Sequence, residues 1–449
     1  MDSKDLLSKL VCYKTINNPI NNVHPDIGII KFIETLVKSW DPKVQAKIIE
    51  KGGYQSIFLT KNPHLKCEIL FMGHLDVVPV TKGWSSDPFT LKIDSGLAFG
   101  RGAKDCKGSV VSALLMFQKL CKEQNNIANE LGFFFSTDEE TGGQYGAKLF
   151  FEYAKNNEIL PKAVINVDGG PQVVHKRRAG FGVKIKLPPR LRKTSGMKQS
   201  QRLETKVVGD ENRHSAYFVA GCDTHAVVAL SKLLYLNRDW VVSDISGSWV
   251  KRNVIPDNIV AEVGIKDASS SSSAEIVYDE YLTRILRKIK SIILLDIETK
   301  IPSDFGISVN PNIIFYSPED GTEVNFDVRA FLELDDANNL LNAFKDRLNE
   351  LNDEATILCP SKSGYFFTSL NTSLVKVASS VLADFSLSSK PCEQEGASDA
   401  RYPSIYDIPV IDLGPKGGRI HGNNEFIILD SMDEFALIYE EIANRLLRK

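Results

Sequence analysis

The sequence predicts an α/β protein in which a mostly parallel sheet is covered by helices and an α+β domain is inserted. Short apolar runs alternate with amphipathic segments towards both ends of the chain. The apolar runs of strand length are 67–72, 131–136, 163–167 and 409–413, and helical spacing marks 28–40, 109–121, 144–155, 368–384 and 431–448. Strands that alternate with helices favour a parallel sheet buried on both faces.

The middle of the chain has a different character, with longer strand-like pieces at 181–187, 258–265 and 323–331. Helix-like pieces occupy 275–294 and 335–351. These pieces predict a separate α+β domain.

Since 449 residues exceed one ordinary core, we expect more than one domain. The first domain is expected to be built from 1–178 and 361–449, and the inserted domain from 179–360. Within the insertion, the basic stretch 190–202 is expected to be a solvated loop and the serine run 269–273 a flexible turn or linker.

Composition narrows the class of protein. Charged residues make up 25% of the chain, hydrophobic residues make up 43%, and the formal net charge is −3, which indicates neither a nucleic-acid nor a membrane-surface partner. No secretory signal is recognisable and no apolar stretch approaches the ~20 residues that span a membrane, so we expect a cytoplasmic protein. The seven cysteines are scattered without a CxxC pair, which argues against a disulfide framework or a thiolate zinc site.

Potential metal ligands follow the predicted strands where each strand ends. These residues are His74, Glu139 and Glu140, Asp168 and His421. In open α/β sheets the carboxyl ends of the strands line the crevice where ligands bind. Four strand ends that share one ligand chemistry therefore predict a common site.

A fifth ligand comes from the glycine-rich segment 100–108, which leads into a predicted helix. Glycines allow the backbone to turn tightly, and Asp105 lies near the helix start, where a carboxylate is favoured.

Histidine and carboxylate ligands without cysteine suit zinc, with cobalt or manganese as possible substitutes. Two ions about 3.5–4 Å apart need a bridging carboxylate and further protein ligands, which the five residues can supply. Asp76 lies two residues beyond His74 on the same strand, so it is expected to orient the imidazole.

Glu139 and Glu140 are adjacent and must point in different directions, which suits one metal ligand and one general base. Four other histidines and Asp138 have more ordinary explanations. Structural roles are expected for His24, His64, His175 and His225, and Asp138 is expected to be a surface or capping residue.

Taken together, five motifs resemble the dinuclear zinc amidohydrolases and exopeptidases. That family includes acetylornithine deacetylase, succinyl-diaminopimelate desuccinylase, aminoacylase and glutamate carboxypeptidase. The motifs are GHLDVVP at 73–79, GRGAKDCKG at 100–108, STDEETGG at 136–143, VDGG at 167–170 and GGRIHGNNE at 417–425.

The resemblance implies that His74 and Asp168 bind one zinc, that Glu140 and His421 bind the other, and that Asp105 bridges the two. It also implies that Glu139 is the general base. The expected reaction is hydrolysis of an amide bond in a small substrate with a free carboxylate, and an N-acyl amino acid fits best.

The inserted domain corresponds in the resemblance to a lid through which homodimers form. His214 matches a lid histidine that stabilises the oxyanion from the partner subunit. Four further residues match positions that contact the substrate, namely Asn253, Arg329, Gly396 and Ser398.

Three departures bear on the substrate. The inserted lid is longer than in the compact desuccinylases. The desuccinylase and acetylornithine branches usually carry glutamate where this chain has Asp168, and Cys106 stands where methionine or aspartate is more usual. A di- or tripeptidase therefore stays open as an alternative, as do a non-catalytic metal-binding homologue and an unrelated zinc aminopeptidase.

Overall fold

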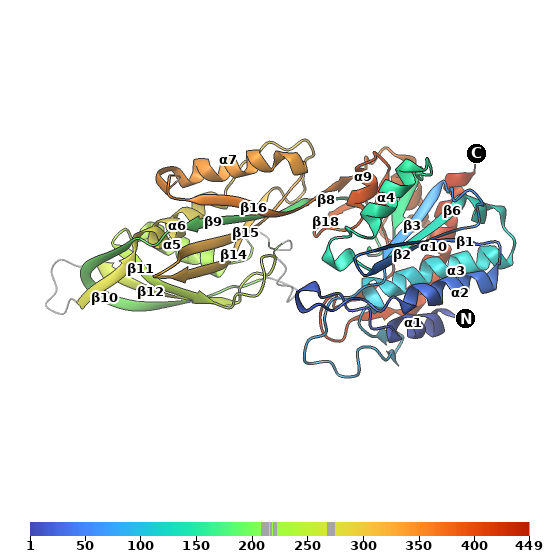
Figure 1. The fold of residues 1–449 in the computed structure, drawn as a ribbon, viewed down its shortest axis with the longest axis horizontal. Helices are drawn as coiled ribbons and strands as arrows, with labels where there is room; N and C mark the ends of the chain where they lie inside the picture. Colours follow the sequence, from blue (N-terminus) through green and yellow to red (C-terminus); the bar gives the residue numbers. More distant parts are fainter. Residues whose placement is uncertain (208–214, 216–217, 219–221, 267–273, 352, 449) are drawn as a thin grey trace. The chain divides into compact units, whose positions relative to one another are not determined.

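The computed structural model describes residues 1–449 except 208–214, 216–217, 219–221, 267–273, 352 and 449. It divides into two compact units (Figure 1). Unit 1 comprises 1–177, 366–394 and 398–449, and unit 2 comprises 178–365 and 395–397. The predicted α/β class with a mostly parallel sheet is confirmed.

Unit 1 is built around a nine-stranded sheet. Its strands are β1 Gln45–Lys51, β2 Tyr54–Thr60, β3 Ile69–His74, β6 Leu131–Ser136, β7 Ala163–Asn166, β8 Val174–Arg177, β17 Phe366–Phe367, β18 Cys392–Gln394 and β19 Val410–Asp412. The order is β1-β2-β6-β3-β7-β19-β8-β17, with β18 beside β8. The central strands β6, β3, β7 and β19 pair in parallel, so their carboxyl ends meet at one edge.

Both faces of this sheet are apolar because its central strands are buried on both sides. Ile69, Phe71 and Phe133 pack into one core, whereas Leu70 and Phe134 pack into the other. This alternation follows the two-residue period of a strand, and it explains why the sequence shows continuous apolar runs here.

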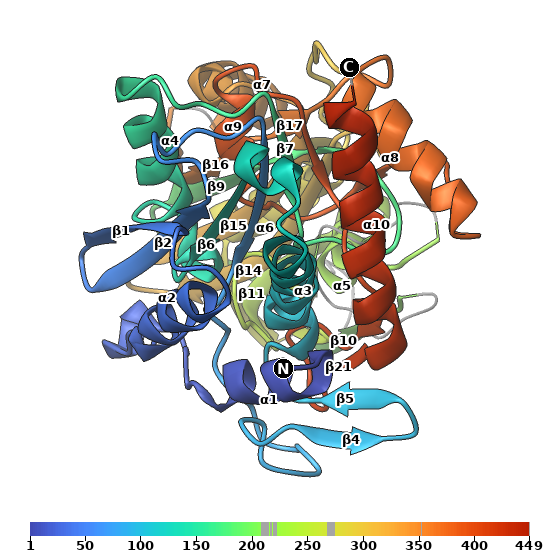
Figure 2. The ribbon, with the colours of Figure 1, turned by 90° about the vertical axis from the view of Figure 1, so that its right-hand side faces the viewer.

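Helices cover the two faces. The helices of unit 1 are α1 Ser3–Cys12, α2 Gly28–Trp40, α3 Gly108–Lys122, α4 Ala147–Asn156, α8 Ser373–Asp384, α9 Arg401–Ser404 and α10 Leu429–Leu447. Apolar residues of α1, α2, α3, α8 and α10 share the first core, and α4 contributes Phe150 and Phe151 to the second. Helices α3 and α10 are in contact, and both can be followed in Figure 2.

A small antiparallel sheet brings distant parts of unit 1 together. It consists of β4 Lys92–Asp94, β5 Leu97–Phe99, β20 Gly417–Gly418 and β21 Phe426–Ile428. Because β5 pairs with β21, the glycine-rich segment after β5 lies beside the segment that carries His421.

Unit 2 contains two four-stranded antiparallel sheets and three helices among its described residues. One sheet has the order β11 Trp240–Gly247, β12 Asn258–Lys266, β10 Leu191–Glu204 and β13 Ala274–Asp279. The other has the order β14 Ser308–Ser317, β15 Gly321–Ala330, β9 Ala179–Leu187 and β16 Thr356–Ser363. The helices are α5 Ala226–Leu236, α6 Glu280–Ile292 and α7 Ala337–Leu348, and they share one core with both sheets.

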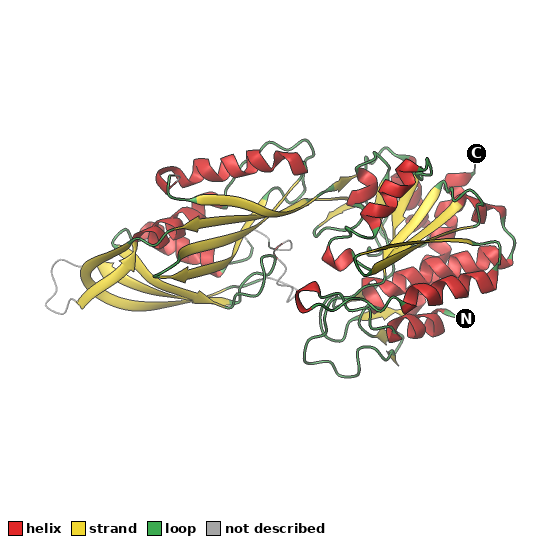
Figure 3. Ribbon diagram, in the orientation of Figure 1, coloured by secondary structure: helices red, strands yellow, loops and turns green. Residues whose placement is uncertain are grey.

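Two expectations for the insertion were wrong. The basic stretch 190–202 is not a loop but most of β10, a long strand visible in Figure 3. Its backbone pairs with β12 on one side and β13 on the other, while most of its side chains face solvent. A run of charged residues therefore does not by itself indicate a loop. Residues 274–279 form β13, so the helix expected from 275 begins only at Glu280. The serine run 269–273 lies outside the described residues.

Across the described part of the chain, no helix combines the length and the apolar character needed to cross a membrane. All seven cysteines are free.

Candidate metal centre

Three neighbouring strands deliver ligand side chains to the same edge of the sheet. His74 ends β3 and pairs in register with Ser136, the last residue of β6. Met72 of β3 is level with Asn166, the last residue of β7. Residues just beyond β6 and β7 therefore reach the level of His74, and these are Glu139, Glu140 and Asp168.

Asp105 enters the site from the glycine-rich segment before α3. Gly102 takes a positive φ of 82°, and a Cβ there would lie 2.6 Å from Val77 Cγ1. The tight approach that brings Asp105 to the strand ends thus requires glycine at this position.

The two carboxylate oxygens of Asp105 face different histidines. Oδ1 lies 2.9 Å from His74 Nε2, and Oδ2 lies 3.0 Å from His421 Nε2. His421 Nε2 is also 3.1 Å from Glu140 Oε1, and His74 Nε2 is 3.9 Å from Asp168 Oδ2. The five residues predicted as ligands thus come together as two clusters that share Asp105.

The orientation of His74 is set by backbone. Its Nδ1 lies 3.0 Å from the carbonyl oxygen of Asp76 and 3.5 Å from the Asp76 carboxylate. A proton on Nδ1 is therefore donated mainly to the carbonyl, which leaves Nε2 free to bind a metal.

The Asp76 carboxylate also holds the turn Glu139–Thr141. It accepts hydrogen bonds from the backbone N–H groups of Glu139 at 3.2 Å and Glu140 at 3.1 Å. Asn17 donates a third bond to it at 2.9 Å. Asp76 therefore positions both glutamates, a role that strand alternation alone did not predict.

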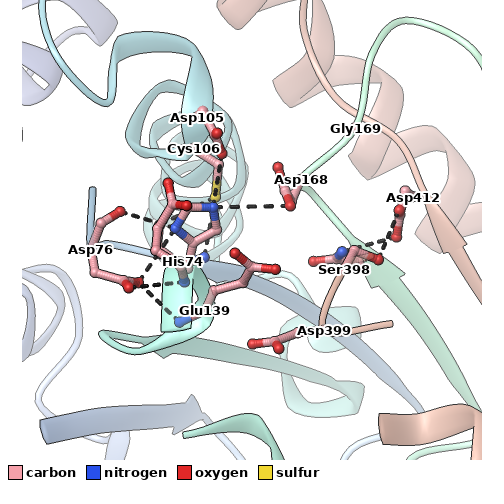
Figure 4. A network of polar contacts seen from close by, with 12 residues as sticks. His74, Asp76, Asp105, Cys106, Glu139, Asp168, Gly169, Ser398, Asp399 and Asp412 are labelled. Carbon is pink, nitrogen blue, oxygen red and sulfur yellow. Dashed lines mark hydrogen bonds and ion pairs between the residues drawn. The ribbon is translucent and has the colours of Figure 1, made fainter. Parts of the chain in front are cut away.

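Glu139 reaches into the space lined by His74, Asp168 and Asp399 (Figure 4). Burial raises the pKa of Glu139 well above its ordinary value, and the nearby carboxylates of Asp399 and Asp168 add to the rise. A carboxyl group with a raised pKa can exchange a proton with a water or an amine near neutral pH, as a general base must.

Buried carboxylates also crowd the two ligand clusters. Burial raises the pKa of Asp168 to about 6, and the neighbouring Asp105 carboxylate adds to this rise. Although burial favours the neutral form of Asp105, hydrogen bonds from His421 and His74 hold its pKa well below its ordinary value. Bound cations stabilise buried acidic groups of this kind, so the electrostatics suit a metal centre.

Cys106 also lies within ligand distance of His74 and Asp168. Its Sγ, however, accepts a bond from the His74 backbone N–H at 3.1 Å and donates to the His74 carbonyl at 3.2 Å. Burial raises the pKa of this thiol to about 12. The neutral thiol thus holds the backbone of a ligand.

The sequence did not indicate a clamp on the turn that carries the glutamates. Arg401 donates to the carbonyl oxygen of Gly142 at 2.7 Å and to that of Ser398 at 3.0 Å. The Tyr402 hydroxyl donates to the same Gly142 carbonyl. Arg401 lies three residues after Ser398, one of the residues expected to contact the substrate.

Asp138 is a buried residue that holds the loop before α4, and not a surface residue. It is 1% exposed, and its Oδ2 accepts the backbone N–H of Tyr145 at 2.6 Å.

Among the residues expected to bind substrate, Ser398, Arg329 and Asn253 have hydrogen-bond partners within the protein. Ser398 donates its hydroxyl to Asp412 at 3.0 Å, and Arg329 is buried in unit 2, where it donates to Asp327 at 2.9 Å. The Asn253 carbonyl accepts the backbone N–H of Ser215. Gly396 takes a positive φ of 90°. His214 lies outside the described residues.

Curated relatives share the sequence at low identity. A succinyl-diaminopimelate desuccinylase from Nautilia profundicola is 23% identical over 447 residues, covering 98% of this chain and 99% of the relative. A desuccinylase from Sulfurovum sp. is 32% identical over 169 residues, covering 37% of this chain. That second match spans 41% of the relative, less than half of its length.

Solved structures share the fold. The aminoacylhistidine dipeptidase of Vibrio alginolyticus matches with a TM-score of 0.68 at 13% identity, covering 100% of this chain and 97% of that one. An M20 family metallo-carboxypeptidase from Sulfolobus solfataricus matches with a TM-score of 0.60 at 16% identity, covering 99% of each chain.

The model of peptidase family M20/M25/M40 matches residues 70–445, which include every residue of the two clusters. The chain therefore belongs to the peptidase family M20/M25/M40 and is a hydrolytic metalloenzyme that acts on amide or peptide bonds.

Proposed function

We propose that the protein is a dinuclear zinc hydrolase that cleaves the amide bond of an N-acyl amino acid. One observation carries this proposal: the two oxygens of Asp105 face the Nε2 atoms of His74 and His421 at 2.9 and 3.0 Å. A carboxylate shared between two histidines is the arrangement that a pair of bridged ions requires.

The donor set fits zinc. Tetrahedral zinc with bonds of about 2.0 Å separates neighbouring ligand atoms by about 3.3 Å. The distances within the two clusters run from 2.9 to 3.9 Å, around this value. One ion would be held by His74, Asp105 and Asp168, and the other by His421, Asp105 and Glu140. Cobalt or manganese could take the same nitrogen and oxygen donors.

When bound, two ions would polarise the substrate carbonyl and lower the pKa of the attacking water to about 7. Glu139 would take the proton from that water and later deliver it to the nitrogen of the leaving amine. The hydrogen bond from the Glu139 backbone N–H to the Asp76 carboxylate fixes the position of the base beside the clusters.

The substrate class rests on two kinds of support. Both relatives reported above are named as desuccinylases, which favours an N-acyl amino acid. A carboxylate on the substrate would be bound by Arg329 and Asn253, and Gly396 and Ser398 would also contact the substrate. Arginine suits that task because its planar fork binds a carboxylate in a bidentate manner.

Cleavage of di- or tripeptides is the second candidate function. It is favoured by Asp168, since aspartate at this position resembles the aminoacylase and dipeptidase-like branches. An intact general base and five intact ligands speak against a non-catalytic homologue.

We further propose a homodimer formed through the inserted domain, with His214 of one subunit acting on the oxyanion of the other. Mixing an inactive Glu139 variant with an inactive His214 variant should restore partial activity. No recovery after proven subunit exchange would rule out action between subunits. A cytoplasmic location stays a prediction from the sequence.

A substrate panel tests the proposed function. Zinc-loaded protein would be assayed for amine release from N-succinyl-diaminopimelate, N-acetylornithine, other N-acetyl amino acids and dipeptides. We expect the highest kcat/KM for an N-acyl amino acid. Highest activity on dipeptides would replace the deacylase by the second candidate, and cleavage of none would contradict both.

A further inference from the structure

Glu425 places a buried carboxylate inside the glycine-rich segment 100–108, which carries Asp105, the ligand proposed to be shared by both ions. Its side chain is 1% exposed, and four donors from the glycine-rich segment surround it. The donors are the backbone N–H groups of Gly102 at 3.1 Å, Lys104 at 2.9 Å and Asp105 at 3.0 Å, and Arg101 Nη1 at 2.8 Å.

The strand pairing explains how Glu425 comes to lie there. Phe426 of β21 pairs with Phe99 of β5, and the Glu425 carbonyl accepts the backbone N–H of Gly100 at 3.0 Å. The side chain of the residue before β21 is thus held against the segment after β5. Within that segment, Glu425 satisfies backbone N–H groups that would otherwise be buried without an acceptor.

The same network reaches the loops of two other proposed ligands. Arg101 Nη2 donates to the carbonyl oxygen of His421 at 3.2 Å. Lys104 Nζ donates to the carbonyl oxygen of Gly169 at 2.6 Å, directly after Asp168. One carboxylate therefore connects, directly or through one side chain, to three loops that carry ligands.

We infer that Glu425 is a positioning residue for both metal ions. This inference rests on the proposed metal-binding function of Asp105 and His421. Glu425 fixes the backbone of Asp105, whose two oxygens face both histidines, so a shift of this backbone displaces a ligand of each ion at once. Substitution of a residue that supports only one ligand would instead lower the affinity for only one ion.

The test replaces Glu425 by glutamine, which keeps the shape of the side chain. A glutamine has one acceptor oxygen, and its NH₂ group would face backbone donors and the Arg101 guanidinium. We expect both ions to bind roughly 10- to 100-fold more weakly, the usual loss when a residue that supports a metal ligand is changed. Zinc affinities would be measured by chelator competition on metal-free protein, without any assay of activity.

Glu393→Gln provides the matched control. Glu393 is a buried carboxylate of unit 1 whose side chain is fully covered, and it lies 3.2 Å from Lys176 Nζ. Its substitution disturbs a buried ion pair of similar kind and should leave both zinc affinities unchanged.

A second variant, Arg101→Lys, keeps the charge beside Glu425 but removes the fork that reaches the His421 carbonyl. We expect weaker binding at the ion held by His421 and Glu140. This variant carries the test if Glu425→Gln does not fold.

The outcomes separate the inference from the proposed function. Lower affinity for both ions in Glu425→Gln, with wild-type affinities in Glu393→Gln, would support the inference. Folded Glu425→Gln or Arg101→Lys with unchanged affinities would overturn it, as would an equal loss in Glu393→Gln. Wild-type protein that binds no zinc would overturn the proposed function and this inference with it.

Discussion

The carboxylate of Asp76 accepts a hydrogen bond of 3.2 Å from the backbone N–H of Glu139. Asp76 follows β3 and Glu139 follows β6, so this bond joins the ends of two parallel strands. Since the Glu140 backbone N–H donates to the same carboxylate, the proposed general base and a proposed metal ligand share one anchor.

Asp76→Asn should therefore impair both functions of the turn. Asparagine has one acceptor oxygen, so at least one of the two glutamate N–H groups loses its partner. We expect kcat and the affinity for the ion held by Glu140 to fall by roughly 10- to 100-fold. Steady-state kinetics and zinc titration would measure the two effects. Asp41→Asn, which changes a partly buried carboxylate paired with Lys61, should alter neither.

Arg401→Lys should lower kcat more than metal affinity. Lysine keeps the charge but cannot bind the Gly142 and Ser398 carbonyls together, so the turn that carries Glu139 loosens. Misplacement of a reacting group by about 1 Å can cost about 100-fold in rate. Kinetics with zinc present at saturation would measure the loss. Arg445→Lys, at a surface ion pair, is the control, and equal kcat in both variants would contradict this role.

Gly143→Ala should cost stability and activity, whereas Gly96→Ala should cost only stability. Both glycines take a positive φ, of 63° and 81°, which costs an alanine about 1–2 kcal/mol. A Cβ on Gly143 would also overlap the Asp399 carboxylate beside Glu139, but a Cβ on Gly96 meets nothing within 4 Å. Thermal unfolding and kcat would be compared, and a loss of kcat in Gly96→Ala alone would refute the prediction.

His225 should make the stability of unit 2 depend on pH. It precedes α5 and accepts the Val227 N–H on Nδ1 at 3.2 Å, while Nε2 lies 3.1 Å from the Asn312 amide oxygen. A second ring proton would point at a donor, and burial lowers the pKa of His225 from 6.5 to about 4.

The sign of the pH effect follows from this lowered pKa. Between pH 6.5 and about 4 the unfolded chain binds a proton that the folded chain excludes, so stability falls as the pH falls. We expect a loss of about 2 kcal/mol from pH 7 to pH 5 that is absent in His225→Asn. Fluorescence-monitored urea unfolding at both pH values would measure it. His64→Asn, which removes an exposed histidine of unit 1, should keep the wild-type difference.

Much of unit 1 could be predicted because its signals are local. Apolar runs predicted the central strands, and the polar residues just beyond these runs were predicted as metal ligands. Parallel pairing then brings consecutive strand ends to one edge whatever the loops between them do. The fold class and the gathering of His74, Glu140 and Asp168 follow from this rule. Asp105 and His421 lie on segments that the pairing of β5 with β21 brings together.

The parts that were missed depend on contacts between distant segments. Glu425 and Arg101 stand in two separate motifs, and only the pairing of β5 with β21 shows that they meet. The basic stretch 190–202 was misread because a strand inside a sheet satisfies its backbone even when its side chains are polar. Asp76 contacts His74 as expected, but its contacts with the turn Glu139–Thr141 were missed because they depend on the pairing of β3 with β6.

The most direct measurement compares wild-type protein with Glu139→Gln, each loaded with two equivalents of zinc, on the best substrate of the panel. The proposed mechanism predicts that both proteins bind two ions and that kcat of the variant is lower by at least about 100-fold, the usual contribution of a general base. A loaded variant that turns over at the wild-type rate would contradict the assignment of Glu139 and the two-metal mechanism built around it.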